Sequence, residues 1–239
     1  MKAKIFILFI FVLLGCKKWN ITTVDNIKVS SFILTNYLVD ATHLYVREIN
    51  NDVNHPNYNI AVLDSTEINK ILSAFQAVYN LKSQESDTVF NIRNIHALRC
   101  FSLNSIGLNV DPKAPEIIKL VNGTRPTGDP KLDGLLNTYQ FDSIKKSYNY
   151  LKFPWISIYT KKSLNLVPII NSLKQLPYVP IAENNGGCFD GNDIILKRDG
   201  TKIMIDFSIG EGDCPAGCTY RRHWIFSVEN GIAKFKGNK

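Results

Sequence analysis

The chain has 239 residues, of which 45% are hydrophobic and 21% are charged. This composition is typical of a folded globular protein and excludes a disordered or collagen-like chain, while a mean hydropathy of −0.07 excludes a polytopic membrane protein. The net charge is +7, but there is no dense block of Lys and Arg and no nucleic-acid motif, so we expect no nucleic-acid partner.

The N-terminus has the layout of an export signal. Lys2 and Lys4 form a short basic start, and residues 5–14 are an unbroken apolar run. A permanent transmembrane helix needs about 20 such residues, so this run has instead the length of the hydrophobic region of a signal peptide. The run ends in Leu13-Leu14-Gly15-Cys16, which resembles the lipobox of bacterial lipoproteins.

The lipobox resemblance implies a location and an anchor. Residues 1–15 would be removed as a signal peptide, and the thiol of Cys16 would carry diacylglycerol, with a further acyl chain such as palmitate on the new N-terminus. Residues 16–28 would form a lipidated tether. We therefore expect an extracytoplasmic protein whose membrane partner is the cell envelope, at the outer membrane, held through Cys16.

Four further cysteines follow, namely Cys100, Cys188, Cys214 and Cys218. An even number in an exported chain predicts disulfides, and four cysteines allow three pairings. The tight 214–218 loop, with its Pro and Gly, favours a local bridge, which would leave Cys100 to pair with Cys188. Metal binding and redox chemistry are the alternatives, but the spacing is neither that of CxxC oxidoreductases nor that of a zinc site.

Residues 29–96 are expected to form an α/β segment. Alternation and β-branched residues predict strands at 41–46 and 58–62. A helix should begin after Asp64, with Glu67 as its capping-box partner, because apolar residues then recur at helical spacing.

Residues 97–187 show the order β-α-β-β-α-β, which is the split βαβ arrangement of ferredoxin-like folds. The first helix should begin after Asp129-Pro130, and Asn165 should cap the second. The fold class we expect is therefore α+β, with a four-stranded sheet. The four predicted strands lie at 100–110, 144–151, 155–160 and 179–183.

Part of this segment resembles a known family. Residues 127–139, 164–173 and 177–184 look like the propeptide of subtilisin-type proteases, in which a helix, two strands, a second helix and a last strand follow one another. The resemblance spans about 124–186. It implies a ferredoxin-like fold and a role as inhibitor and folding template, with a protease as the protein partner.

Residues 188–239 predict a C-terminal antiparallel β unit that contains the Cys214–Cys218 loop. Asp199-Gly200 is a strong hairpin signal, and Asn230-Gly231 should turn the strand at 224–228 back on itself. The loop at 210–218 resembles an element of secreted bacterial proteins.

The sequence contains no motif for catalysis, for a cofactor or for a metal. We therefore expect a non-catalytic protein-binding module without cofactor, similar to a protease propeptide or inhibitor. One alternative is an extracytoplasmic hydrolase with a site near His223, Arg221, Arg222 and Asp213. Another alternative is a structural component of the envelope.

Overall fold

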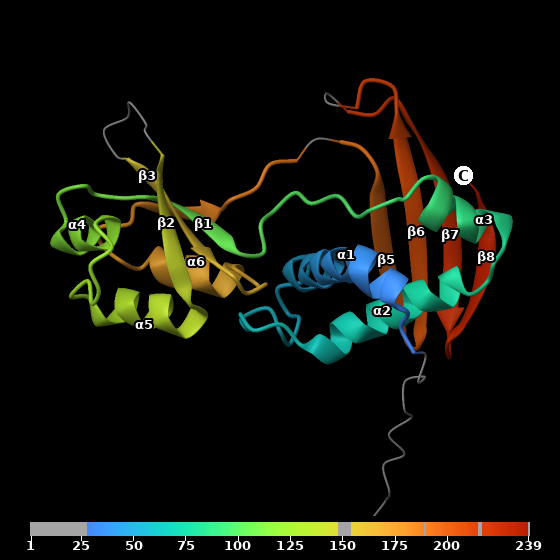
Figure 1. The fold of residues 1–239 in the computed structure, drawn as a ribbon, viewed down its shortest axis with the longest axis horizontal. Helices are drawn as coiled ribbons and strands as arrows, with labels where there is room; N and C mark the ends of the chain where they lie inside the picture. The colour runs from blue at the N-terminus through green and yellow to red at the C-terminus, as the bar shows by residue number, and fades with distance from the viewer. Residues whose placement is uncertain (1–27, 148–153, 189, 215–216, 239) are drawn as a thin grey trace, which may run out of the picture.

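The computed structural model describes residues 28–147, 154–188, 190–214 and 217–238. In this part of the chain, helices accompany two four-stranded antiparallel sheets (Figure 1). The predicted α+β class is therefore confirmed. The two sheets lie toward opposite ends of the long axis of the molecule, and two chain crossings join them.

The first helices are α1 (Ser31–Asn50) and α2 (Ser65–Tyr79), followed by α3 (Gln84–Asp87) and the π-helix η1 (Thr88–Ile92). The side chain of Ser30 caps α1, and the Asp64 carboxylate caps α2 by accepting from the amide of Thr66 at 2.8 Å. The predicted start of α2 is therefore confirmed.

The predicted strand at 41–46 is wrong, because these residues lie in the middle of α1. β-Branched and aromatic side chains favour a strand locally, but apolar residues also recur here at helical spacing. Ile33, Tyr37, Leu44 and Ile49 are all buried against the remainder of the protein. Packing of this stripe therefore overrides the local strand propensity.

The C-terminal sheet has the order β5-β6-β7-β8. The strands are β5 (Asp193–Asp199), β6 (Lys202–Glu211), β7 (Tyr220–Glu229) and β8 (Ile232–Asn238). Both predicted hairpins are present. Gly200 has a φ of 57°, and Asn230 and Gly231 have φ values of 49° and 72°, which are the left-handed conformations that tight hairpin turns require.

The N-terminal helices and this C-terminal sheet share one hydrophobic core. Aromatic rings dominate it: the ring of Phe207 lies 5.9 Å from Phe75 and 5.4 Å from Phe90, centroid to centroid. Segments 29–96 and 188–239, far apart in sequence, thus form one structure. We call residues 28–98 and 190–238 the helix–sheet body.

Residues 103–185 form the second structure, which we call the ferredoxin-like unit. Its sheet has the order β2-β3-β1-β4 with all neighbours antiparallel, as the split βαβ arrangement requires. The predicted arrangement is confirmed, and α4 is an additional helix that the sequence did not predict. The elements are β1 (Ser105–Asn109), α4 (Pro115–Val121), α5 (Pro130–Tyr139), β2 (Phe141–Ser147), β3 (Trp155–Thr160), α6 (Val167–Leu173) and β4 (Ile181–Asn184).

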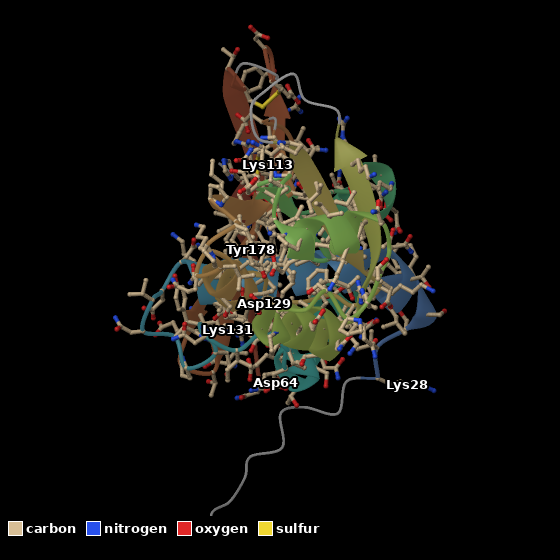
Figure 2. All side chains as sticks on the ribbon, turned by 90° about the vertical axis from the view of Figure 1, so that its left-hand side faces the viewer. Lys28, Asp64, Lys113, Asp129, Lys131 and Tyr178 are labelled. Atoms are coloured by element: carbon tan, nitrogen blue, oxygen red, sulfur yellow. A yellow bond between two sulfur atoms is a disulfide. The ribbon has the colours of Figure 1, made fainter. Side chains whose placement is uncertain are left out.

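The start of α5 forms as the sequence predicts. The Asp129 carboxylate accepts from the amides of Lys131 and Leu132 at 2.7 and 3.2 Å, while Pro130 occupies the first turn. The hydroxyl of Tyr178 donates to the same carboxylate at 2.8 Å, and Figure 2 shows the two residues close together on this end of the molecule. This contact ties the approach to β4 to the beginning of α5.

The loop between α1 and α2 docks onto the ferredoxin-like unit through Asn165. Its side-chain amide donates to the carbonyls of Tyr58 and Ile60 at 3.0 and 3.2 Å, and its backbone amide donates to Ala61 at 2.9 Å. Asn165 has no exposed surface. The predicted strand at 58–62 is wrong, since only a single bridge pairs Val62 with Leu164.

We predict that Asn165→Ala lowers the free energy of unfolding by about 2–3 kcal/mol, because two carbonyls lose their donor inside the structure. Asn171→Ala, at an exposed position of α6, should change it by less than about 0.5 kcal/mol. Urea unfolding measures both values, and equal losses in the two variants would contradict the docking role of Asn165.

Candidate functional site

Cys16, the predicted lipid attachment site, lies outside the described residues. In the described part of the chain, no helix combines the length and the apolar character that crossing a bilayer requires. The same residues contain no group of three or more His, Cys, Asp or Glu side chains placed to hold a metal ion.

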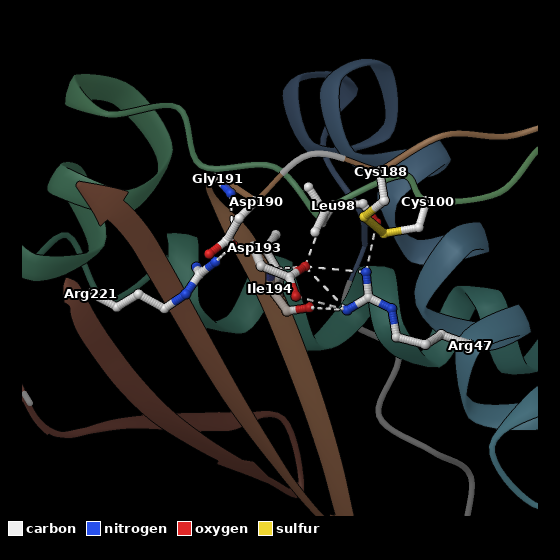
Figure 3. The surroundings of a disulfide bond; sticks show 9 residues. All are labelled: Arg47, Leu98, Cys100, Cys188, Asp190, Gly191, Asp193, Ile194 and Arg221. Carbon is white, nitrogen blue, oxygen red and sulfur yellow. Dashed lines mark hydrogen bonds and ion pairs between the residues drawn. A yellow bond between two sulfur atoms is a disulfide. The ribbon is translucent and has the colours of Figure 1, made fainter. Parts of the chain in front are cut away.

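The predicted cysteines form two disulfides, Cys100–Cys188 and Cys214–Cys218. The first joins the two chain crossings between the helix–sheet body and the ferredoxin-like unit (Figure 3). We call these crossings, residues 98–102 and 185–188, the neck. The second closes the loop between β6 and β7, as the tight 214–218 spacing predicted.

Further contacts hold the neck on the side of the ferredoxin-like unit. The amide of Ser102 donates to the Asn184 side chain at 2.6 Å, and that side chain donates back to the Ser102 carbonyl at 2.9 Å. The crossings are so close that a Cβ at Gly186 would lie 2.6 Å from the carbonyl oxygen of Cys100. Glycine is therefore required at that position.

On the side of the helix–sheet body, Arg47 and Asp193 hold the neck (Figure 3). The guanidinium of Arg47, on α1, contacts the Asp193 carboxylate at 3.1 Å and donates to the Leu98 carbonyl at 2.7 Å. The Asp193 carboxylate accepts in turn from the amide of Leu98 at 2.8 Å. This ion pair satisfies backbone groups of the first crossing and joins it to both α1 and β5.

We predict unequal contributions from the two disulfides. Cys100 and Cys188 are 88 residues apart, whereas Cys214 and Cys218 are 4 apart. In the chain-entropy description, replacing the first pair by Ser lowers the free energy of unfolding by about 4.6 kcal/mol, and replacing the second lowers it by about 2 kcal/mol. Urea unfolding of the two double variants measures the difference, and a larger loss for the 214–218 pair would contradict it.

A buried charge lies close to the neck in the middle of α1. The Asp40 carboxylate has no exposed surface and accepts from His96 Nδ1 at 2.7 Å and from the amide of Ala97 at 3.0 Å. Arg99 lies at 3.4 Å from the same carboxylate. A buried carboxylate needs such partners, and here they fix the chain that leads into the neck.

The Asp40–His96 pair has the form of an oriented general base, since the carboxylate holds Nδ1 and leaves Nε2 available. Nucleophilic catalysis also needs a hydroxyl or thiol within reach of that nitrogen. No Ser, Thr, Tyr or Cys among the described residues hydrogen-bonds to His96, and the nearest aromatic neighbour, Tyr37, is stacked on it at 5.0 Å. The contacts of this cluster join α1 to the segment that leads into the neck.

His43, one turn further along α1, is buried and neutral. Its ring lies 5.0 Å from that of Phe101, and its Nδ1 has no hydrogen-bond partner. Burial, reinforced by the positive charge of Arg99, lowers the pKa of the imidazole from 6.5 to about 4. Sequence reasoning missed Asp40, His43 and Arg47. Their spacing places them on one face of a helix, but the sequence predicted a strand at 41–46 instead of the helix at 31–50.

We predict that His43 makes the protein less stable in acid. Because the unfolded chain binds a proton near pH 6.5 and the folded chain only near pH 4, stability falls as pH decreases through this window, by about 3 kcal/mol at its lower end. Between pH 7 and pH 4.5, the free energy of unfolding should decrease in both proteins, and the decrease in His43→Phe should be smaller than that in the wild type by about 2 kcal/mol. Urea titrations at both pH values test this, and identical losses in the two proteins would refute it.

The predicted alternative site near His223 is spread over two faces of the C-terminal sheet. His223 Nδ1 lies 3.0 Å from the Asp206 carboxylate, and Arg221, two residues earlier on the same face of β7, pairs with Asp190. Arg222 points to the opposite face, as alternation along a strand requires, and pairs there with Glu211 at 2.5 Å. Asp213 is an exposed loop residue. The four predicted residues therefore do not meet in one cleft.

Ser208 lies directly opposite His223 in the register of β6 and β7, next to Asp206. The three residue types of a catalytic triad are thus neighbours on one sheet face. However, Ser208 is 2% exposed, and its hydroxyl donates to the Asp193 carbonyl and accepts from Arg221. A hydroxyl held in this way is not presented as a nucleophile.

The ferredoxin-like unit presents a sheet face that the helices leave open. Ile156 and Ile158 of β3 are buried beneath α5 and α6, whereas Trp155, Ser157 and Tyr159 point to the other side and stay partly exposed. Lys145 of β2 lies on this open face, with its Nζ 5.1 Å from the centroid of the Tyr159 ring.

A cavity opens beside this sheet, between α4 and the ends of β1, β2 and β3. Its volume is about 330 Å³. Eight of its lining residues are apolar, and the polar contribution comes from Lys146 and Asn122. The apolar residues are Val110, Pro112, Ile117, Ile118, Val121, Pro154, Trp155 and Ile156.

No family model, curated protein or solved structure matches the chain.

Proposed function

We propose that the protein is a lipid-anchored, extracytoplasmic and non-catalytic module that binds another protein through the open sheet face of its ferredoxin-like unit. The observation that carries the proposal is that face itself, where Trp155 and Tyr159 stay partly exposed beside Lys145. Large aromatic side chains with a polar end are the residues that contribute most to protein–protein interfaces.

The proposed location is supported by two independent features of the chain. Leu13-Leu14-Gly15-Cys16 resembles a lipobox, and two disulfides are typical of an oxidising compartment rather than of the cytosol. A chain of this kind would be held at the outer membrane through the lipid on Cys16.

The geometry suits a module presented from a surface. The proposed tether, residues 16–28, spans at most about 45 Å when extended. It joins the described structure at Lys28, which is labelled in Figure 2, and the ferredoxin-like unit and the helix–sheet body lie toward opposite ends of the long axis in Figure 1. In Figure 2, Lys113 of the ferredoxin-like unit is labelled above Lys28, while Asp129 and Lys131 of the same unit lie nearer to its height.

The resemblance of residues 124–186 to subtilisin-type propeptides makes an extracellular serine protease the partner to test first. We predict that the protein binds a subtilisin-type protease and that Tyr159→Ala weakens binding at least about fivefold, because a partly exposed interface Tyr contributes more than about 1 kcal/mol. Tyr220→Ala is the matched control, since Tyr220 is 55% exposed on the other sheet. Surface plasmon resonance measures both affinities. Equal affinities for the two variants would contradict the proposed face.

The anchor needs a separate test. We predict that metabolic labelling with a clickable fatty acid marks the wild-type protein and places it in the membrane fraction. Cys16→Ala should lose both the label and the membrane association, because its thiol is the proposed attachment point. An unlabelled wild-type protein would refute the lipid anchor and would leave the protease experiment unaffected.

A further inference from the structure

We propose that the cavity beside α4 binds the alkyl carboxylate of a medium-chain fatty acid, with the chain inside the cavity and the carboxylate paired with Lys146. This inference goes beyond the proposed protein-binding function and does not depend on it. It rests on the size of the cavity, the chemistry of its walls and the position of one cation.

The walls suit an alkyl chain. Val121 and Trp155 are partly exposed lining residues, whereas Val110, Ile117 and Ile156, which also line the cavity, are at most 2% exposed. Ile118, on α4, leaves 47% of its surface exposed although it lines the cavity. A bound chain would remove this apolar surface from water, which is the main source of affinity for an apolar ligand.

The volume sets the length of the chain. A water molecule occupies about 30 Å³ in the liquid, so a cavity of about 330 Å³ holds roughly ten groups of water or methylene size. The cavity therefore fits a chain of about eight to ten carbons. A longer chain would extend into solvent.

The polar side of the cavity favours an anion. Lys146 and Asn122 are the polar residues of the lining, and none of the lining residues is a carboxylate. Within the described residues, Lys146 lies in no ion pair, whereas its neighbour Lys145 lies over the ring of Tyr159 on the opposite face of β2. A ligand with several polar groups, such as a sugar or a nucleotide, would leave most of them without a partner against these walls.

The size argument is tested with a series of saturated carboxylates from hexanoate to tetradecanoate, each below its micellar concentration. The protein is the mature chain with Cys16→Ala, so that no lipid of its own competes. Binding is measured by calorimetry and by intrinsic tryptophan fluorescence, to which Trp19, Trp155 and Trp224 contribute. We expect one site, with affinity rising about fourfold per methylene up to about ten carbons and then levelling off. Affinity that keeps rising through tetradecanoate, or that ignores chain length, would overturn the proposal.

The charge argument is tested with Lys146→Met and its matched control Lys145→Met, on adjacent positions of β2. We expect Lys146→Met to weaken decanoate binding at least tenfold and to leave decanol binding unchanged, because only the carboxylate pairs with the ammonium group. Lys145→Met should bind both ligands as the wild type does. If the wild type binds decanol as tightly as decanoate, Lys146 does not select the anion and the proposal is wrong.

The position of the site is tested on α4. Ile118→Asp places a negative charge at an exposed position of the lining, where it repels a carboxylate without disturbing the core. We expect at least a tenfold loss of decanoate affinity, with an unchanged circular dichroism spectrum and melting curve. Unchanged decanoate affinity in this folded variant would place the binding site elsewhere. Retention of the protein on anionic vesicles without binding of free decanoate would point instead to a bilayer surface.

Discussion

The arrangement of this protein depends on the neck, where the chain crosses twice between its two sheets. The Cys100–Cys188 disulfide joins the crossings, Gly186 lets them approach, and the Arg47–Asp193 ion pair fastens the first of them to α1 and β5. A second attachment runs through the buried side chain of Asn165, which joins the loop between α1 and α2 to the ferredoxin-like unit. Two separate attachments restrict rotation of one structure against the other more than either alone, so the open face of the ferredoxin-like unit keeps a defined direction relative to Lys28.

This constraint explains where the buried charges of the chain lie. Asp40, deep in the helix–sheet body, is paired with His96 and Arg99 on the segment that enters the neck. Removing His96 or Arg99 would leave the buried carboxylate with fewer of the contacts that replace its hydration, which is costly. The charged and titratable groups near the neck therefore position chain segments. Among the described residues, His43 is the buried His whose Nδ1 has no hydrogen-bond partner. Burial lowers its pKa to about 4, so we expect the same region to lose stability in acid.

The surfaces available for binding belong to the ferredoxin-like unit. Its helices cover one face of its sheet, and the opposite face carries partly exposed aromatic residues next to Lys145. The cavity beside α4 lies at the end of the same unit, with Lys146 pointing to the other side of β2. Adjacent lysines on one strand thus serve two distinct proposed ligands, a protein and a fatty carboxylate, because strand alternation separates them. The helix–sheet body would carry the anchor and hold this unit away from it.

Local patterns in the sequence were sufficient for the features that depend on neighbouring residues. The Asp129-Pro130 helix start, the Asp199-Gly200 hairpin, the β-α-β-β-α-β order and the 214–218 disulfide all follow from short-range chemistry. The tertiary structure decided the rest. It made 41–46 part of a helix, because burial of a long apolar stripe outweighs strand propensity. It brought α1 and α2 onto a sheet formed more than a hundred residues later, and it paired Arg47 with Asp193 at the neck. Such pairings depend on contacts between segments distant in the chain, which no local pattern of residues encodes.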